Sequence, residues 1–565
     1  MEHASPAILA LSLAALVARI GFAANHYVVP AGTAGNLPAA PYSTWATAAN
    51  GIADAMEAAA DDADAICIRV APGVYAIGST IEIARSNVDI RSDDGNGDFA
   101  CENTILDGGL LDGRTNRVFT VKYVKNVSAS NVAIRGFTIR NSGVNGQGGG
   151  IMVEEGFSEF TLDGCTLTNC QARISGSAKG GGVFFGSVNA KGHVITNCSF
   201  VSCVAGGIGG AISGKNSKSA YAARSTYLLV MDSEFIDCGV VKTAGIDGAT
   251  SKRGAIFAVP CWFERTLFRH GYGADSNNGN IAADGSPYSV LVDCTFEGTS
   301  GKFFYSSPLK MLGCIFRDNS GVMGTVVEID SCVFSNNTYN AYSAAYFNGG
   351  TVRNCLYTRN GQPFTAMGNT LVENCSIISN RQCGIYMGAA KWKARFVNCV
   401  VYGNENFTAS GAGQSGNANF AQVASWRSSA DSSLVLTNCV IGGADSVSIV
   451  NYKGTGVGIS ANSGATYPLS DFDASGKTGE LSTTVDMIGP RFADASNGDW
   501  RPRRKSPLRD AGVLLAWMNA PATDLDGNPR LTDAFGKAFA SSALPDLGCY
   551  ECQAQTPRNT TILLQ

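Results

Sequence analysis

The sequence predicts an all-β solenoid, a parallel β-helix of about a dozen coils, on three observations. A short phrase recurs at spacings of 18 to 40 residues, and the shortest spacings cluster near 20. Within each phrase apolar and polar residues alternate, which is the period of a β-strand. Each strand is too short to bury its apolar face alone, whereas stacked coils would bury a continuous core.

The phrase is illustrated by "DSCVFSNN", residues 330–337. The phrase has three defining positions. The first is held here by Cys332, and the second, two places later, by the apolar Phe334. The third, five places after the first, is held here by Asn337 and elsewhere by cysteine, asparagine, threonine or histidine. We expect the first two positions to form inward ladders, and the third to form a ladder at the turn, where an asparagine amide bonds to the backbone and to its neighbour one coil away. The first positions are Phe137, Cys165, Cys198, Ser233, Arg265, Cys294, Cys314, Cys332, Cys355, Cys375, Cys399 and Cys439. The second are Ile139, Leu167, Phe200, Phe235, Leu267, Phe296, Phe316, Phe334, Tyr357, Ile377, Val401 and Ile441, and the third are Cys170, Cys203, Cys238, His270, Thr299, Asn319, Asn337, Asn360, Asn380 and Asn404.

The chain has 18 cysteines, most of them at ladder positions. Neighbouring rungs could reach disulfide distance, but a disulfide also needs a dihedral angle that in-register stacking does not guarantee. We therefore expect stacked free thiols, with disulfides as the alternative. A second phrase, "GGGIMV" at 148–153, recurs as "GGGVFF", "GGAIS" and "RGAIF". It predicts a tight glycine corner leading into another strand, because no helix follows that would make a phosphate-binding loop.

Composition and termini define the domain organisation. Residues 1–24 read as a signal peptide, and no later run is long and apolar enough for a membrane-spanning helix, so we expect none in the mature chain. Residues 25–63 predict a cap in which Trp45, Ala49, Ile52, Met56 and Ala59 share one helical face. The β-helix is assigned to 64–450, a C-terminal capping module to 451–552 and a tail to 553–565. A charged fraction of 16% and a net charge of −4 argue against nucleic-acid binding.

Several stretches carry three family resemblances. "YSTWATAANGIADAM", "RVAPGVY" and "TILDGG" resemble the opening of bacterial right-handed parallel β-helix proteins of the pectin-lyase-like superfamily. "NGDWRPRRKSPLRDAG", "TDLDGNPR" and "PDLGCYE" are similar to the C-terminal module of choice-of-anchor Q surface proteins, and the "GGA" and "FxxN" phrases resemble polymorphic outer-membrane protein repeats. The resemblance implies a right-handed coil and a secreted or cell-surface location. It does not imply one activity, because this fold carries lyases, hydrolases and non-catalytic proteins.

The candidate functional residues lie where the repeat becomes irregular. Long inserts between Cys198 and Cys294 predict loops that wall a groove. Binding candidates there are Lys215, Lys218 and Asp275, and catalytic candidates are Asp247, Lys252, Arg253 and His270, for which solvated loops and a ladder histidine are the competing interpretations. Asp93, Asp94 and Asp98 in "SDDGNGD" suit a hard cation such as calcium, and a plain surface turn is the favoured interpretation.

We therefore expect an exported or cell-surface monomer that binds an extracellular polysaccharide or another surface ligand without turnover. No complete lyase or hydrolase motif is present in the sequence, which favours binding over catalysis. The alternatives are a polysaccharide lyase or glycoside hydrolase, and an adhesin or structural surface protein.

Overall fold

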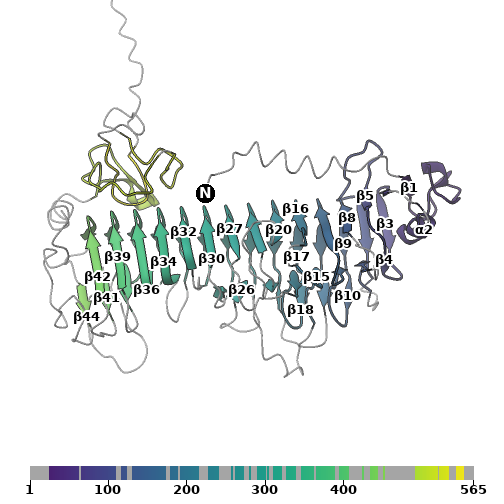
Figure 1. The fold of residues 1–565 in the computed structure, drawn as a ribbon, viewed down its shortest axis with the longest axis horizontal. Coiled ribbons are helices and arrows are strands. Elements are labelled where there is room, and N and C mark those ends of the chain that lie inside the picture. The colour runs from purple at the N-terminus through teal and green to yellow at the C-terminus, as the bar shows by residue number, and fades with distance from the viewer. Residues whose placement is uncertain are drawn as a thin grey trace, which may run out of the picture. The chain divides into compact units, whose positions relative to one another are not determined.

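The chain forms a right-handed parallel β-helix of stacked strands (Figure 1). Its coils fall into two compact units. The first unit holds residues 1–266, 271–274 and 280–284, and the second holds 267–270, 275–279 and 285–565. The computed structural model describes residues 24–60, 62, 65–109, 116–123, 130–172, 178–188, 191–215, 227–240, 256–258, 261–272, 279–281, 289–300, 302–304, 309–320, 326–338, 345–361, 364–387, 393–405, 423–425, 433–442, 449–451, 490–519, 521–532 and 543–552.

In the first unit each coil contributes strands to separate parallel sheets, paired in register with the coils on either side. The first sheet contains β1 (Ala24–Val28), β2 (Ile66–Val70), β5 (Val88–Ser92), β8 (Ser130–Arg135), β12 (Ser158–Asp163), β16 (Val194–Thr196), β20 (Leu228–Met231) and β24 (Cys261–Glu264). The second contains β3 (Gly73–Ala76), β6 (Thr104–Asp107), β9 (Thr138–Arg140), β13 (Thr166–Thr168), β17 (Ser199–Val201) and β21 (Glu234–Ile236). The third contains β4 (Ile81–Ile83), β7 (Phe119–Val121), β11 (Ile151–Val153), β15 (Val183–Phe185), β19 (Ile212–Gly214), β23 (Phe257–Ala258) and β26 (Gly279–Ile281), and a short fourth contains β10 (Gly143–Val144), β14 (Gln171–Ala172), β18 (Val204–Ala205) and β22 (Gly239–Val240).

The second unit continues the same pattern with longer strands in its first sheet. That sheet contains β27 (Val290–Val292), β30 (Leu309–Leu312), β32 (Val326–Asp330), β34 (Ala345–Arg353), β36 (Phe364–Glu373), β38 (Ile385–Met387), β39 (Lys393–Val397), β41 (Val423–Ser425), β42 (Ser433–Thr437) and β44 (Ile449–Asn451). Its second sheet contains β25 (Leu267–Arg269), β28 (Thr295–Glu297), β31 (Ile315–Arg317), β33 (Val333–Ser335), β35 (Leu356–Thr358), β37 (Ser376–Ile378), β40 (Val400–Tyr402) and β43 (Val440–Gly442). β29 (Lys302–Phe304) completes the coil elements, and β45 (Phe492–Asp494), the 3₁₀ turn η5 (Ala495–Asn497) and β46 (Asp499–Pro502) follow near the C-terminus.

Inward side chains stack in ladders, as the repeat predicts. Phe268, Phe296, Phe316 and Phe334 occupy successive rungs, with ring centroids 4.5, 4.6 and 5.0 Å apart and nearly parallel planes. These distances match the spacing of neighbouring strands, so ring stacking and backbone pairing support each other. All 18 cysteines are free thiols. The stacked-thiol interpretation therefore agrees with the structure.

A ladder of buried asparagine amides follows the second sheet of the second unit. Asn337 donates from Nδ2 to Asn360 Oδ1 (2.9 Å) and to the carbonyl oxygen of Phe316 (3.0 Å), and its backbone N–H donates to the same Asn360 Oδ1 (3.1 Å). The pattern confirms the predicted turn ladder. Equivalent triplets of bonds are made by Asn319, Asn360 and Asn380.

Cysteine takes over the asparagine position in the first unit. The Cys203 thiol donates to the carbonyl of Leu167 (3.4 Å), and the Cys238 thiol to that of Phe200 (3.3 Å). These acceptors are equivalent to those used by the asparagine amides, since each lies one coil below on the apolar ladder residue. Cysteine therefore preserves the bond to the neighbouring coil's carbonyl, and thiol contacts between Cys170, Cys203 and Cys238 take the place of the amide bonds between rungs.

One register prediction is wrong by a single residue. The structure pairs Leu267 with Thr295 and Phe268 with Phe296, so Thr266, not Arg265, occupies the cysteine position. A one-residue shift moves every side chain to the opposite face of the strand. Accordingly Phe268, not the predicted Leu267, is the buried residue. His270 lies outside the ladder; it is exposed and its backbone is left-handed, with a φ of 51°.

The glycine phrases form tight corners, as expected. Gly180 has a φ of +68°, and a Cβ at Gly181 would lie 2.2 Å from the carbonyl oxygen of Val204 in a neighbouring coil. Only glycine permits this approach of one backbone to the next. The corner leads directly into β15.

The N-terminal cap differs in detail from the prediction. The α-helix α2 spans only Ile52–Ala58 and packs against β1, β2 and β4, while Trp45 belongs to a separate 3₁₀ turn, η1 (Trp45–Thr47). Ala49 forms a β-bridge with Val28, so the chain is extended between the two helical pieces. The predicted continuous helical face through Trp45 and Ala49 is therefore wrong. Across the residues described, no helix is long and apolar enough to cross a membrane.

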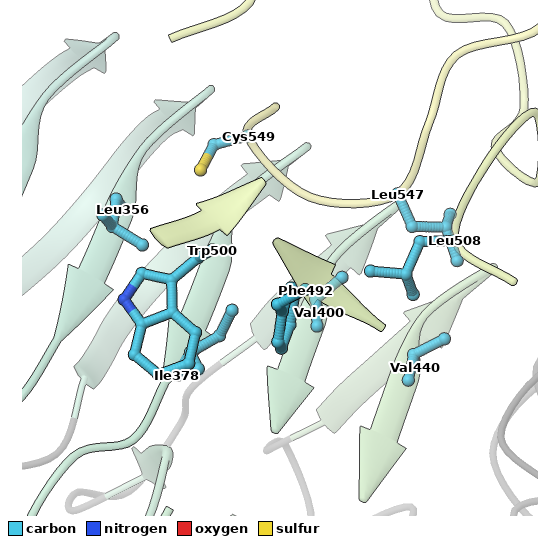
Figure 2. Packing of buried hydrophobic residues seen from close by; sticks show 9 residues of the cluster. All are labelled: Leu356, Ile378, Val400, Val440, Phe492, Trp500, Leu508, Leu547 and Cys549. Carbon is cyan, nitrogen blue, oxygen red and sulfur yellow. The ribbon is translucent and has the colours of Figure 1, made fainter. Parts of the chain in front are cut away.

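The described C-terminal residues, 490–519, 521–532 and 543–552, pack on the side of the coils of the second unit. Phe492, Trp500, Leu508, Leu547 and Cys549 cover outward side chains of four consecutive second-sheet strands (Figure 2). The prediction of a module that caps the end of the solenoid did not anticipate this lateral docking. The covered outward residues are Leu356, Ile378, Val400 and Val440.

Candidate functional site

Three arginines stand in one outward column on the first sheet of the first unit. Arg69 on β2 pairs in register with Arg91 on β5, which pairs with Arg135 on β8. We call these three residues the arginine column. The rungs beyond it are Tyr27 on one side and Asp163 on the other.

Strand alternation explains why these side chains point outward. On β2 the apolar residues Ile66, Ile68 and Val70 are buried, which leaves Cys67 and Arg69 on the opposite face. The same alternation on β5 and β8 exposes the other two arginines. The side chains of Arg69, Arg91 and Arg135 are 30, 31 and 18% exposed.

Carboxylates hold the two outer members of the column. Arg69 makes hydrogen bonds and an ion pair to Asp93. Arg135 donates to Asp163 Oδ2 (2.7 Å), and its Nε lies 3.3 Å from Asp89 Oδ1. Both outer guanidinium groups are therefore fixed in position by charge-assisted contacts.

Arg91, the central member, is the least satisfied. Its nearest carboxylate oxygen, Asp89 Oδ2, lies 3.7 Å from Nη1, beyond hydrogen-bonding distance, and its buried Nε has no hydrogen-bond partner. The guanidinium lies over the ring of Phe99 at 5.1 Å from the ring centroid. Arg91 thus retains donor capacity that the protein itself does not use.

The arginine column is unusual because it places the same charge on three successive strands. In the second unit the comparable outward column reads Asp330, Arg353 and Glu373, with Arg353 3.5 Å and 3.2 Å from its two acidic neighbours. Alternating charges stabilise neighbouring strands, whereas like charges directly opposite each other destabilise them. The arginine column lacks this alternation, which identifies it as a candidate for binding an external anion.

Aromatic residues flank the column. Tyr27 lies 5.9 Å beneath the Arg69 guanidinium, and Trp45 packs edge-on against Tyr27 with ring centroids 4.5 Å apart. Trp45 is 37% exposed and Phe99 41% exposed. Together they provide apolar surfaces next to hydrogen-bond donors, the combination that ligand sites use.

Asp89 is the most perturbed carboxylate at the site. Burial raises its pKa, while Arg135 and Arg91 act in the opposite direction. Its position between two arginines explains why a carboxylate is tolerated here at 7% exposure. Asp89, the carboxylate that lies nearest Arg91 among the described residues, is therefore shared with Arg135.

The predicted calcium residues form a hydrogen-bonded turn. Asp93 Oδ1 accepts the N–H groups of Gly95 and Gly97 at 2.8 and 3.2 Å, and its other oxygen binds Arg69. Asp94 Oδ1 accepts from Asn96 and Asp98 at 2.7 and 3.3 Å, and the backbone bond from Asn96 is the main cause of its lowered pKa. In the described part of the chain, no three histidine, cysteine or acidic side chains are grouped to hold a metal ion. Calcium binding by Asp93, Asp94 and Asp98 stays a prediction.

Two of the predicted groove residues, Lys215 and His270, lie among the described residues, one in each compact unit. Lys215 forms an exposed ion pair with Glu155 at 2.9 Å. His270 belongs to the second unit and packs over Gly298. The remaining candidates fall outside the described residues, and their roles stay predictions: Lys218, Asp247, Lys252, Arg253 and Asp275.

Sequence reasoning missed the arginine column, although a signal was present. The dipeptide Ile-Arg occurs at 68–69, 90–91 and 134–135, each time in a strand of alternating pattern. The repeat alignment began only at Phe137 and did not include these coils. Aligning the three Ile-Arg pairs would have placed the arginines on one face.

Comparisons with known proteins give weak likenesses. No protein-family model matches the chain, and no curated protein sequence matches it. Among solved structures, a mannuronic acid-specific family 6 polysaccharide lyase from human gut microbiota is 9% identical, covers 59% of this chain and 80% of its own, and has a TM-score of 0.35. A family 6 lyase from Pseudopedobacter saltans is 11% identical over 75% and 89% of the two chains, with a TM-score of 0.34. A surface adhesin of Streptococcus pneumoniae is 12% identical over 70% and 88%, with a TM-score of 0.29.

Proposed function

We propose that this is an exported or cell-surface protein that binds an acidic extracellular polysaccharide at the arginine column without turning it over. The observation that carries the proposal is the like-charged column whose central member, Arg91, is 31% exposed and has its nearest carboxylate oxygen 3.7 Å from Nη1, beyond hydrogen-bonding distance. A guanidinium offers a planar fork of donors that matches a carboxylate, and it stays protonated, so it suits holding an anion better than removing a proton.

The stacked geometry favours a polymeric ligand over a single small anion. Arginines on successive strands are separated by the strand spacing of about 4.8 Å, so the donors recur along a line. A polysaccharide with acidic groups along its length could engage several rungs at once and gain affinity from multiple contacts. Trp45, Tyr27 and Phe99 supply apolar faces for the sugar rings.

Global charge does not favour this binding, which makes it a specific prediction. The chain carries a net charge of −4, so a polyanion is repelled on average and must be held by a local site. We also propose, on the sequence resemblance, that a signal peptide directs export and that the C-terminal module is of the choice-of-anchor Q type.

The test is equilibrium binding of the intact protein to matched polysaccharides. Polygalacturonate, alginate and hyaluronan would be compared with the neutral polymers dextran and mannan, at low and physiological salt, because screening weakens exposed charge contacts. The same mixtures would be assayed for unsaturated products and for new reducing ends.

We expect tighter binding to acidic than to neutral polymers, weakening with salt, and no product. Binding to none of the polymers contradicts the proposal. Equal binding of neutral polymers contradicts the role of the arginines, and product formation contradicts binding without turnover.

A further inference from the structure

The C-terminal module, residues 490–552, is held to the second sheet by a column of asparagines. Each has a left-handed backbone and presents its amide to the backbone of the module. Asn398 is the most complete, since it donates to the carbonyl of Val513 (2.7 Å) and accepts that residue's N–H (2.8 Å). The others are Asn354 to Thr523, Asn374 to Asp546 and Asn438 to Ala511.

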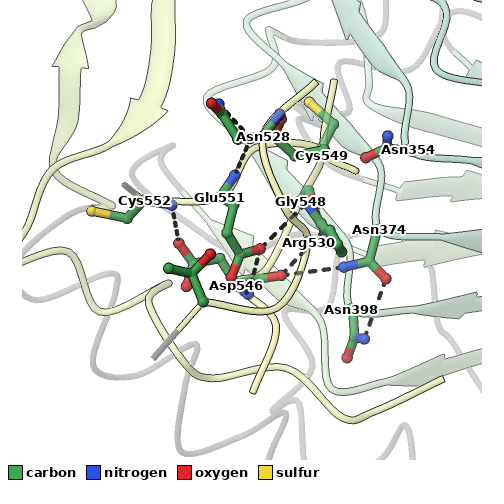
Figure 3. Close-up of polar contacts among 12 residues, drawn as sticks. Asn354, Asn374, Asn398, Asn528, Arg530, Asp546, Gly548, Cys549, Glu551 and Cys552 are labelled. Atoms are coloured by element: carbon green, nitrogen blue, oxygen red, sulfur yellow. Dashed lines mark hydrogen bonds and ion pairs between the residues drawn. The ribbon is translucent and has the colours of Figure 1, made fainter. Parts of the chain in front are cut away.

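Within the module, next to the asparagines of the sheet, lies a group of buried charged side chains (Figure 3). Arg530 is fully buried and donates to the carbonyls of Gly548 and Asp546. Three carboxylates surround it, from Asp524, Asp546 and Glu551, and none is more than 5% exposed. We call these four residues the charge cluster.

The charges of the cluster do not balance. Arg530 Nη1 lies 3.6 Å from Glu551 Oε2, and the other two carboxylates accept backbone N–H groups instead of binding a cation. With all groups ionised, the cluster as the described residues form it holds three negative charges and one positive charge. A buried charge without a partner is strongly unfavourable, and proton uptake relieves it.

The residues of the cluster are also the residues that dock. The carbonyl of Asp546 accepts from Asn374 on the sheet (3.2 Å) and from Arg530 in the cluster (3.4 Å). Close by, Gly548 donates to the carbonyl of Asn398 (2.8 Å) and Cys549 donates to Ser376 Oγ (3.1 Å). Segment 546–552 therefore cannot leave the sheet without disturbing the charge cluster.

We infer that the charge cluster makes the C-terminal module an acid-strengthened clasp, which holds the second sheet more tightly at mildly acid pH than at neutral pH. Segment 546–552 carries Asp546 and Glu551 and is bound to the sheet, so its release would bring both carboxylates into contact with water, and the docked state binds protons more readily than the released state. Linkage then requires docking to tighten as protons become available.

The direction follows from the pKa values. Burial raises the pKa of Asp546 from 3.8 to about 6, and burial with the charge of Asp546 raises that of Glu551 well above its usual value. The pKa of Asp524 is also raised by burial. A raised folded-state pKa adds stability that is complete below the unfolded value and is lost as pH rises through the folded value. The effect therefore lies between about pH 4 and pH 6.

The groups that face the cluster from neighbouring elements do not reverse the upward shift of the carboxylate pKa values. From the module itself, Asp510 donates its N–H to Asp546 (2.7 Å) and its carboxylate raises the Asp546 pKa further. The thiol of Cys552 and the guanidinium of Arg509 lie near its edge, and the Cys549 thiol faces the sheet. The sheet contacts nearest segment 546–552 are neutral: the amides of Asn354, Asn374 and Asn398, the hydroxyl of Ser376 and the thiol of Cys375. Two arginines of the sheet contact other parts of the module, Arg359 at the carbonyl of Ser496 (3.3 Å) and Arg353 over the ring of Trp517 (4.8 Å).

The test is hydrogen exchange of segment 546–552 in the intact protein at about pH 5 and about pH 7.5, corrected for intrinsic exchange and referred to the coil amides of β28 and β31. From the Asp546 values of 3.8 and about 6, the opening equilibrium should be about tenfold smaller at the lower pH. Glu551→Gln mimics the protonated side chain, so it should shrink this ratio. Glu405→Gln, which alters an exposed carboxylate of the same unit, should keep the wild-type ratio.

A wild-type ratio of one, or a module that opens more at acid pH, overturns the clasp. A Glu551→Gln protein with the full wild-type ratio overturns the assignment to the cluster. If that variant does not fold, the wild-type profile alone still gives the sign.

Discussion

Arg91→Ala is expected to weaken binding of an acidic polysaccharide by about 10- to 100-fold. A charge-assisted hydrogen bond contributes about 1.5–3 kcal/mol, which is one to two factors of ten in the dissociation constant. Arg91 is expected to contribute most because its side chain is 31% exposed and its Nη1 lies 3.7 Å from the nearest carboxylate oxygen, too far for a hydrogen bond. Arg69 and Arg135 are already bound to Asp93 and Asp163.

The matched control is Arg395→Ala. Arg395 is also an exposed, outward arginine on a first-sheet strand, but its rung neighbours are Leu371 and Val435 instead of arginines. It should bind the polysaccharide as the wild type does. Arg91→Lys, which keeps the charge and loses the planar fork, should fall between the two. Equal weakening by Arg91→Ala and Arg395→Ala would mean that the arginine column has no special role.

Asn360→Ala is expected to destabilise the second unit by about 3–6 kcal/mol, as the sum of a few unsatisfied buried groups. Removing the amide leaves the backbone N–H and the Nδ2 of Asn337 without their acceptor, and the carbonyl of Phe334 without its donor. Ser335→Ala, which changes a partly exposed side chain on the neighbouring strand, should have little effect. The measurement is the free energy of opening of the β33, β35 and β37 amides by hydrogen exchange.

Asn360→Cys gives a sharper version of the same test. Cysteine occupies the equivalent position at Cys203 and Cys238, where its thiol reaches the same kind of carbonyl. Cysteine should therefore be better tolerated than alanine at position 360. A loss below about 1 kcal/mol for Asn360→Ala, or cysteine that is no better than alanine, would contradict the ladder account.

The sequence predicts the inward side chains of the coils better than the arrangement of the outward ones. Inward positions repeat with fixed chemistry, so the ladders through Cys332, Phe334 and Asn337 could be placed from the pattern alone. The register failed at Arg265, where two apolar residues, Leu267 and Phe268, stand side by side and only stacking on Phe296 decides which one faces inward. Local pattern cannot contain that information, because it belongs to a contact 28 residues away.

The surroundings of an outward side chain depend on segments distant in the sequence, and for this reason the docking of the C-terminal residues and the arginine column were not predicted. Leu356, Val400 and Val440 appear in the sequence as ordinary strand residues, yet they are buried because residues 490–552 return to cover them. Likewise Arg91 is informative only beside Arg69 and Arg135, which lie one coil away on either side. Candidate sites drawn from loop length alone pointed to Lys252 and Asp275, which lie outside the described residues.

The most direct test of the proposed function is arginine labelling with a dicarbonyl reagent, with and without a saturating acidic polysaccharide, followed by mapping of the modified residues. Bound polysaccharide should slow the labelling of Arg91 strongly and leave Arg395 unchanged, since only the first belongs to the arginine column. Arg91 labelled at the same rate while the polysaccharide is demonstrably bound would contradict the proposal.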